Sequence, residues 1–177
     1  MYNSLTQTQN IATNYQEGEK KQFLKFYLEP ATKAMLPLAE VTEVLKVPLG
    51  KIVPIPQMPP WTMGIYNWRG EILWTIDLGH LLGISTWYQQ QKNTINYSIV
   101  VISSRNQGRS AVNLGLIVTQ VEDIEWCNIH EIKSSVNSNI SSELAPFLEG
   151  YFISVDEQMT LILNGNNIID NMPQKIN

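Results

Sequence analysis

The sequence predicts an all-β fold, either small barrels or a sandwich, and best described as two small barrels that share a core. Three observations support this fold class. Apolar residues alternate over short runs at regular spacing, helical periodicity is almost absent, and the strand pattern stops at the polar residues 85–96 and then restarts. We therefore expect one folded unit over residues 23–170, with a first barrel at about 23–84 and a second at about 97–165. Residues 1–22 are expected to be a disordered tail, and residues 171–177 a second tail.

The first run of strands opens with Leu24, Phe26 and Leu28 on one face. The apolar period of residues 35–47 is ambiguous, and a strand is favoured over a half-turn of helix or a bulged strand. Five prolines in residues 48–60 leave room for one short edge strand at most, because proline cannot donate to a sheet ladder. This segment is expected to be an extended crossover loop.

Residues 61–78 predict a β-hairpin around which the chain is organised. Arg69-Gly70 is the expected reversal point, since glycine accepts the positive φ of tight hairpin turns. The returning strand alternates with a period of two, which predicts one buried face formed by Ile72, Trp74, Ile76 and Leu78. A rigid hairpin with a single cation at its bend is suited to docking.

Beyond the hairpin, Asp77 is expected to cap a helical turn that ends at Gly83. Residues 97–102 are apolar on both faces, which predicts a covered central strand. Residues 112–126 are interpreted as a continuing strand, in which Gly115 allows a bulge or a close backbone approach. The remaining expected elements are a loop at 128–142, a strand pair at 148–153 and 159–163, and a closing helical turn at 166–170.

The composition indicates a protein that contacts partners. Hydrophobic residues make up 44% of the 177 residues, and charged residues only 16%, against about 25% in an average soluble protein. Low charge with five Trp and seven Tyr is typical of contact surfaces. A net charge of −4 disfavours binding to nucleic acid or to anionic membranes, which requires clustered basic residues.

No catalytic, cofactor or metal site is predicted. Cys127 is the single cysteine, so an intramolecular disulfide is excluded and a cytoplasmic location is favoured. His80 and His130 lack neighbours at metal-ligand spacing, and neither a nucleophile elbow nor a phosphate-binding loop occurs. The sequence also lacks a signal peptide and an apolar run long enough to insert into a bilayer.

Several motifs occur in an order that resembles the CheW family of chemosensory adaptors. They are FLKFYL, LPLAEVTEVL, IVPIPQMPP, MGIYNWRGEILWTIDL, LGLIVTQVEDI and EGYF…MTLIL, and they cover residues 23–170. The resemblance implies two packed five-stranded SH3-like β-barrels with short helical turns and a groove at their junction. It also implies a non-catalytic adaptor without cofactors. Its partners would be the cytoplasmic signalling tip of a chemoreceptor and the regulatory domain of a CheA-type histidine kinase, in membrane-associated chemosensory arrays.

The resemblance assigns site residues to both expected barrels. The receptor-binding groove is expected to contain Val41, Glu43, Gly64, Asn67 and Arg69. Kinase or receptor contacts in the second barrel are expected at Val121 and Ile124. The sequence departs from the family at Trp74, where proline is usual, and at Thr119, where aspartate is frequent. Its Asn- and Gln-rich surface and polar tail resemble cyanobacterial members that serve twitching or phototaxis arrays.

Simpler interpretations stand beside these assignments. Arg69 is either a partner contact or a turn residue paired with Glu71 or Asp77. Without the resemblance, valine and isoleucine in strands are more often core than contact, and the glycines are backbone devices. A nucleic-acid-binding small barrel is the alternative function, for which Trp68 and Arg69 would begin the required basic and aromatic stripe. An enzyme acting in the groove is disfavoured because no acid–base pair is evident.

Overall fold

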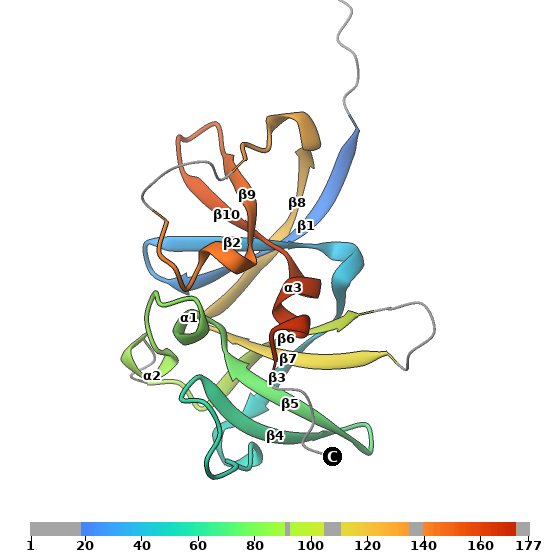
Figure 1. Cartoon of the computed structure of the whole chain (residues 1–177), viewed down its shortest axis with the longest axis vertical. Coiled ribbons are helices and arrows are strands. Elements are labelled where there is room, and N and C mark those ends of the chain that lie inside the picture. Colours follow the sequence, from blue (N-terminus) through green and yellow to red (C-terminus); the bar gives the residue numbers. More distant parts are fainter. Residues whose placement is uncertain (1–18, 91–92, 105–110, 135–139, 173–177) are drawn as a thin grey trace, which may run out of the picture.

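The computed structural model describes residues 19–90, 93–104, 111–134 and 140–172, and these form two stacked five-stranded sheets (Figure 1). The strands are β1 (Lys20–Glu29), β2 (Thr32–Pro37), β3 (Val41–Pro48), β4 (Thr62–Trp68), β5 (Glu71–Asp77), β6 (Asn96–Ser104), β7 (Val112–Val118), β8 (Gln120–Asn128), β9 (Leu148–Ile153) and β10 (Met159–Leu163). The helical segments are α1 (Leu78–Leu81), α2 (Trp87–Gln90), α3 (Gly165–Asp170) and the 3-10 turns η1 (Leu38–Glu40), η2 (Leu49–Lys51), η3 (Ile129–Glu131) and η4 (Ala145–Phe147). The predicted all-β class with short helical turns is confirmed.

The predicted tails fall largely outside the described residues, which omit 1–18 and 173–177. The expected boundary at residue 22 is wrong, because β1 already begins at Lys20, which lies opposite Asn128 of β8. None of the helices in the described residues has the length and hydropathy needed to cross a lipid bilayer.

The two sheets do not follow the expected division at residues 85–96. Sheet A has the order β8-β1-β2-β10-β9, and sheet B has the order β3-β6-β7-β5-β4. A first barrel at 23–84 and a second at 97–165 is therefore wrong, since both ends of the chain build sheet A and the middle builds sheet B. The described part of residues 85–96 lies between β5 and β6, two strands of sheet B, and it includes α2 and the first residue of β6.

The chain crosses between the sheets at η1 and at Thr119. Residues 35–47 and 112–126 were each expected to continue as one element, yet each is split between the two sheets. At Thr119 the apolar alternation runs on without a glycine or proline turn signal, so that change of sheet leaves no trace in the pattern. At η1 the signal was available but unused, because Pro37 ends β2 and precedes the 3-10 turn. Thr119 fixes its crossing by donating its backbone N–H to the Tyr27 carbonyl (2.9 Å) and its hydroxyl to the Leu28 carbonyl (2.7 Å).

Each sheet has its own core, and the sheets share a third. Strand β6 illustrates the arrangement, because Ile99 and Val101 face the core of sheet B while Val100 and Ile102 face the shared core. The predicted covered central strand is thus confirmed. The shared core also receives the expected face of β1 and two isoleucines of α3; its members from β1, β2, β7 and α3 are Leu24, Phe26, Leu28, Ala34, Leu36, Leu114, Leu116, Val118, Ile168 and Ile169.

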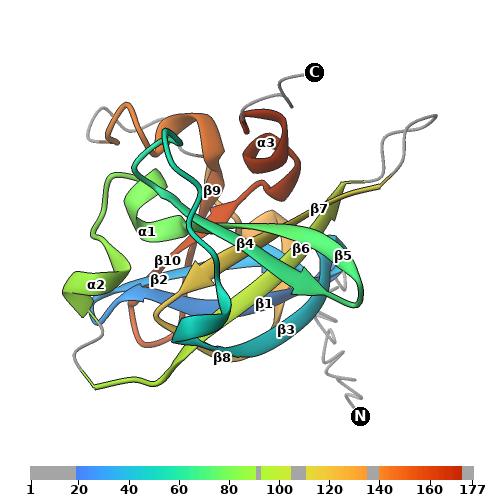
Figure 2. The same ribbon diagram turned by 90° about the horizontal axis from the view of Figure 1, so that it is seen from below.

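In each sheet, a segment that follows a 3-10 turn pairs with one edge strand through an isolated β-bridge. The segment after η2 reaches the outer edge of β4, where Val53 and Ile65 exchange two backbone hydrogen bonds of 2.9 Å. The segment after η3 reaches β9 in the same way, where Lys133 and Tyr151 exchange two bonds of 2.9 Å. These bridges cover the edge strands β4 and β9, while the edge strands β3 and β8 run along the side away from α1 and α3 (Figure 2).

The hairpin reverses where the sequence predicts. Arg69 and Gly70 both have positive φ, 55° and 84°, which is the type I′ geometry favoured in two-residue hairpins. The expected buried face is wrong at Ile72, whose side chain is 68% exposed, while the neighbouring Leu73 is fully buried in the core of sheet B. Ile72 is the second residue of β5, directly after the hairpin turn, where the strand is exposed.

Asp77 caps the helical turn as predicted, and it also holds the next one. Its Oδ1 accepts the His80 N–H (3.2 Å) and its Oδ2 accepts the Trp87 N–H (2.7 Å), so one carboxylate fixes both α1 and α2. The side chain is buried. Burial raises the pKa of the Asp77 carboxyl group, against the opposing effect of the hydrogen bonds from Trp87 and His80.

We expect Asp77→Ala to lower the unfolding free energy by about 2 kcal/mol or more, because two backbone donors lose their acceptor. In the wild type, the raised pKa of this carboxyl group contributes stability that is fully present below its unfolded pKa and is lost as the pH rises through the folded pKa. Asp77→Asn cannot titrate, so its stability relative to the wild type should rise as the pH is increased from about 4. Urea denaturation across this pH range checks both expectations, with the exposed Asp156→Asn as control. A constant difference between Asp77→Asn and the wild type would contradict the raised pKa.

Candidate functional site

The structure brings together two of the predicted groove residues at the hairpin end of sheet B. The Arg69 guanidinium Nη2 lies 2.9 Å from the Glu43 carboxylate Oε2. The same oxygen accepts a hydrogen bond from the Trp68 indole Nε1 (2.9 Å), and the guanidinium lies 5.2 Å from the Trp68 ring centroid. Because β3 and β4 are opposite edges of sheet B, these contacts connect the two edges across the open side of the sheet.

Arg69 remains available to a partner although it is paired. Its side chain is 68% exposed, and an exposed ion pair contributes only about 0–1 kcal/mol. The carboxylate that pairs with Arg69 is that of Glu43. The ion pair with Glu71 or Asp77, which was the alternative expected for a turn residue, is not the one that forms. Sequence reasoning missed Trp68 as the buried element beneath the cation; its position directly before the turn was the available signal.

Asn67 and Gly64 build the hairpin locally. The Asn67 Oδ1 accepts the Gly70 N–H (3.0 Å) and so closes the turn that carries Arg69. Gly64 is buried and has a φ of 138°, and a Cβ at this position would lie 2.2 Å from the Val53 carbonyl oxygen. The interpretation of Gly64 as a backbone device therefore has a direct physical reason.

The remaining predicted contacts differ in burial. Val41 and Val121 are half-buried and pack against the shared core. Ile124 is 48% exposed, and Trp126, two residues further along the same strand, is 62% exposed. Both lie on β8, which belongs to sheet A together with the N-terminal strands rather than to a barrel of residues 97–165. Sequence reasoning treated Trp126 only as the end of a strand.

Carboxylates neutralise the lysines beside this strand. The Lys25 Nζ lies 2.6 Å from Glu125, 3.2 Å from Asp123 and 3.5 Å from Glu122, and Lys33 lies 3.3 Å from Glu122. Burial lowers the pKa of Lys25, but hydrogen bonds to Glu125 and Asp123 and the charges of Glu125 and Glu122 outweigh it and raise the pKa above its ordinary value. The surface here is not a basic stripe, which disfavours the nucleic-acid alternative.

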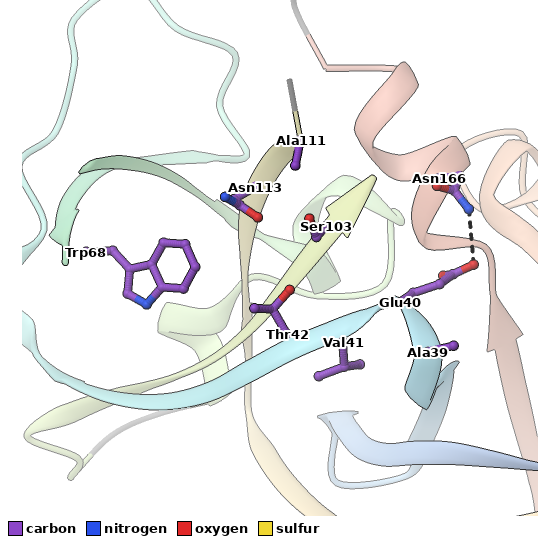
Figure 3. Close-up of a pocket in the computed structure, with 9 residues that line it drawn as sticks. All are labelled: Ala39, Glu40, Val41, Thr42, Trp68, Ser103, Ala111, Asn113 and Asn166. Carbon is purple, nitrogen blue, oxygen red and sulfur yellow. Dashed lines mark hydrogen bonds between the residues drawn. The ribbon is translucent and has the colours of Figure 1, made fainter. Parts of the chain in front are cut away.

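An open polar cavity of about 640 Å³ lies where η1, β3, β6, β7 and α3 meet (Figure 3). Figure 3 shows the Glu40 side chain extending away from the cavity centre toward Asn166. Among the described residues that line the cavity, Glu40 is the single ionisable one. The lining residues are Ala39, Glu40, Val41, Thr42, Trp68, Ser103, Ala111, Asn113 and Asn166. Within the described residues, no group of three or more His, Cys, Asp or Glu side chains is arranged to hold a metal ion.

The two departures from the family pattern have structural roles. Trp74 is half-buried, and its side chain packs against the shared core. Thr119 holds the crossing between the sheets through the Tyr27 and Leu28 carbonyls.

Comparison with known proteins identifies a family and a related structure. The model of the CheW-like domain family matches residues 22–172. The crystal structure of the scaffolding protein TtCheW from Thermoanaerobacter tengcongensis is similar over 82% of this chain and 90% of that chain, with a TM-score of 0.65 and 25% sequence identity. No curated protein sequence matches this chain.

Proposed function

This chain belongs to the CheW-like domain family, and from that premise we propose that it is a non-catalytic scaffold that couples chemoreceptor signalling tips to a CheA-type histidine kinase. The observation that carries the proposal is the pairing of this family fold with an exposed, oriented cation at the end of sheet B. The similar TtCheW structure is described as that of a scaffolding protein.

Within this function, Arg69 is the proposed centre of the receptor contact. The Trp68 ring and the Glu43 carboxylate contact the guanidinium from two strands, so little side-chain freedom is lost when a partner binds. Val41 is the proposed apolar part of the same contact, and Gly64 and Asn67 act by shaping the hairpin. Interfaces with such an anchor and a polar surround are suited to reversible binding.

The second proposed contact lies on β8 in sheet A. Ile124 is exposed in mid-strand, Val121 is half-buried three residues before it, and β8 is an edge strand. We assign this surface to the kinase regulatory domain or to the receptor. Recruitment through the receptor would bring a cytoplasmic chain to membrane-associated arrays, and the receptor itself would decide whether swimming, twitching or phototaxis is controlled.

Isothermal titration calorimetry with a purified receptor tip and a kinase regulatory domain tests the function. We expect both to bind with micromolar-class affinity, and each to change the affinity for the other by the same factor, of about 5-fold or more, because linkage between two sites is reciprocal. If saturating receptor tip left the affinity for the kinase domain unchanged, the coupling role would be contradicted. Failure of both partners to bind would contradict the function as a whole.

A further inference from the structure

Glu40 connects the crossing segment η1 to the C-terminal helix α3. The Glu40 Oε2 accepts the Gly165 backbone N–H (2.8 Å), and its Oε1 accepts the Asn166 side-chain Nδ2 (3.3 Å; Figure 3). The two ends of this contact are 125 residues apart in sequence. It therefore joins the segment that enters sheet B to the helix that follows the last strand of sheet A.

The contact depends on a glycine. A Cβ at Gly165 would lie 2.5 Å from the Glu40 Oε2, so any other residue there would displace the carboxylate. The carboxylate is also partly withdrawn from water: burial raises the pKa of Glu40, while the Gly165 hydrogen bond opposes that rise. An acidic side chain that is partly desolvated and has a glycine as its neighbour forms a fitted contact rather than a chance surface encounter.

The far end of the contact is rigid. Helix α3 buries Ile168 and Ile169 in the shared core and contacts β6. The near end leads directly into β3, because Val41 follows Glu40 and donates its N–H to the Leu38 carbonyl. Two residues further, Glu43 holds Arg69. The Glu40 carboxylate thus ties the start of β3, with the proposed receptor contacts, to α3, in addition to the pairing of Val41 with Ile102 of β6.

We propose that Glu40 is a positioning residue for receptor binding: by clamping η1 to α3 through Gly165 and Asn166, it sets the orientation of Val41 and, through Glu43, of Arg69. This inference rests on the proposed function, because the surface that it positions is the proposed receptor contact. Glu40 itself need not touch the receptor.

Four variants of the full chain test the clamp by receptor-tip calorimetry. Glu40→Ala removes both acceptors, and Gly165→Ala displaces the carboxylate from the other side; each should weaken binding by about fivefold. Glu40→Gln keeps an acceptor for the Gly165 N–H and should bind within about twofold of the wild type. Asn171→Ala removes a side-chain bond to Asn167 at the other end of α3 and should bind like the wild type. The double variant Glu40→Ala/Gly165→Ala should be no weaker than either single variant, because both remove the same contact.

Hydrogen exchange separates positioning from general destabilisation. The Val41 amide should exchange faster in Glu40→Ala and Gly165→Ala, while the Ile99 amide in the centre of β6 keeps its wild-type protection. Wild-type receptor affinity in both variants, or equal loss of protection at Val41 and Ile99, would overturn the proposal. If the wild type does not bind the receptor tip, the proposed function fails, and unchanged exchange at Val41 would then still overturn the clamp on its own.

Discussion

Gly64→Ala is expected to lower the unfolding free energy by about 3 kcal/mol or more, a large effect for the addition of one methyl group. Two causes add at this position. A Cβ would lie 2.2 Å from the Val53 carbonyl oxygen and 2.9 Å from the Pro54 Cα, and the φ of 138° is one that L-residues rarely adopt. Relief of the clash requires the Val53–Ile65 bridge to open, which exposes the edge of β4.

Two other glycines separate these causes. Gly70 has a φ of 84° with no atom within 4 Å of its added Cβ, so Gly70→Ala tests the backbone cost alone, about 1 kcal/mol. Gly50 has open space and no positive φ, so Gly50→Ala should be neutral or slightly stabilising. Urea and thermal denaturation measure all three. Equal losses of unfolding free energy in Gly64→Ala and Gly70→Ala would show that the close approach of Val53 does not add to the cost at Gly64.

Arg69→Ala is expected to weaken receptor-tip binding by about tenfold or more while leaving the fold intact. The functional loss follows from the exposure and fixed orientation of the guanidinium, since arginine anchors are frequent hot spots. The stability loss should stay within about 1 kcal/mol, because the pair with Glu43 is exposed on the arginine side. Calorimetry against a receptor tip, together with a melting curve of each protein, gives both quantities.

The design includes a conservative and a matched variant. Arg69→Lys keeps the charge but loses the planar contact with the Trp68 ring and should bind with intermediate affinity. Lys51→Ala removes another exposed cation of the same part of the fold and should bind like the wild type. Unchanged receptor affinity in Arg69→Ala, alongside an unaltered melting curve, would remove Arg69 from the proposed contact.

Local elements of this fold are readable from the sequence because their causes are local. The type I′ turn is signalled by the glycine at its second position, and the helical turn after β5 by the carboxylate before it, so the predictions for Arg69-Gly70 and Asp77 are confirmed. Strand β6 was predicted for the same reason, since apolar residues on both faces report burial on both sides.

Long-range features could not be read in this way. Alternation states that a residue is in a strand, but not which sheet the strand joins, so the crossings at η1 and Thr119 were missed and the two barrels were wrongly divided. The contacts of the candidate site have the same character: Glu43 meets Arg69 only because β3 and β4 are the two edges of one sheet. Motif resemblance supplied the names of these residues, and their geometry had to come from the fold.

The interleaving of the two sheets has a consequence for biosynthesis. Sheet B is built from one contiguous stretch, residues 41–118, whereas sheet A needs β1 and β2 from the start of the chain and β8 to β10 from its end. During synthesis, sheet B has all its strands well before the ribosome finishes, while the first two strands must wait for the last three to emerge. The earliest strands to leave the ribosome are therefore among the last to find their partners, and through that interval their apolar faces depend on sheet B or on chaperones for cover.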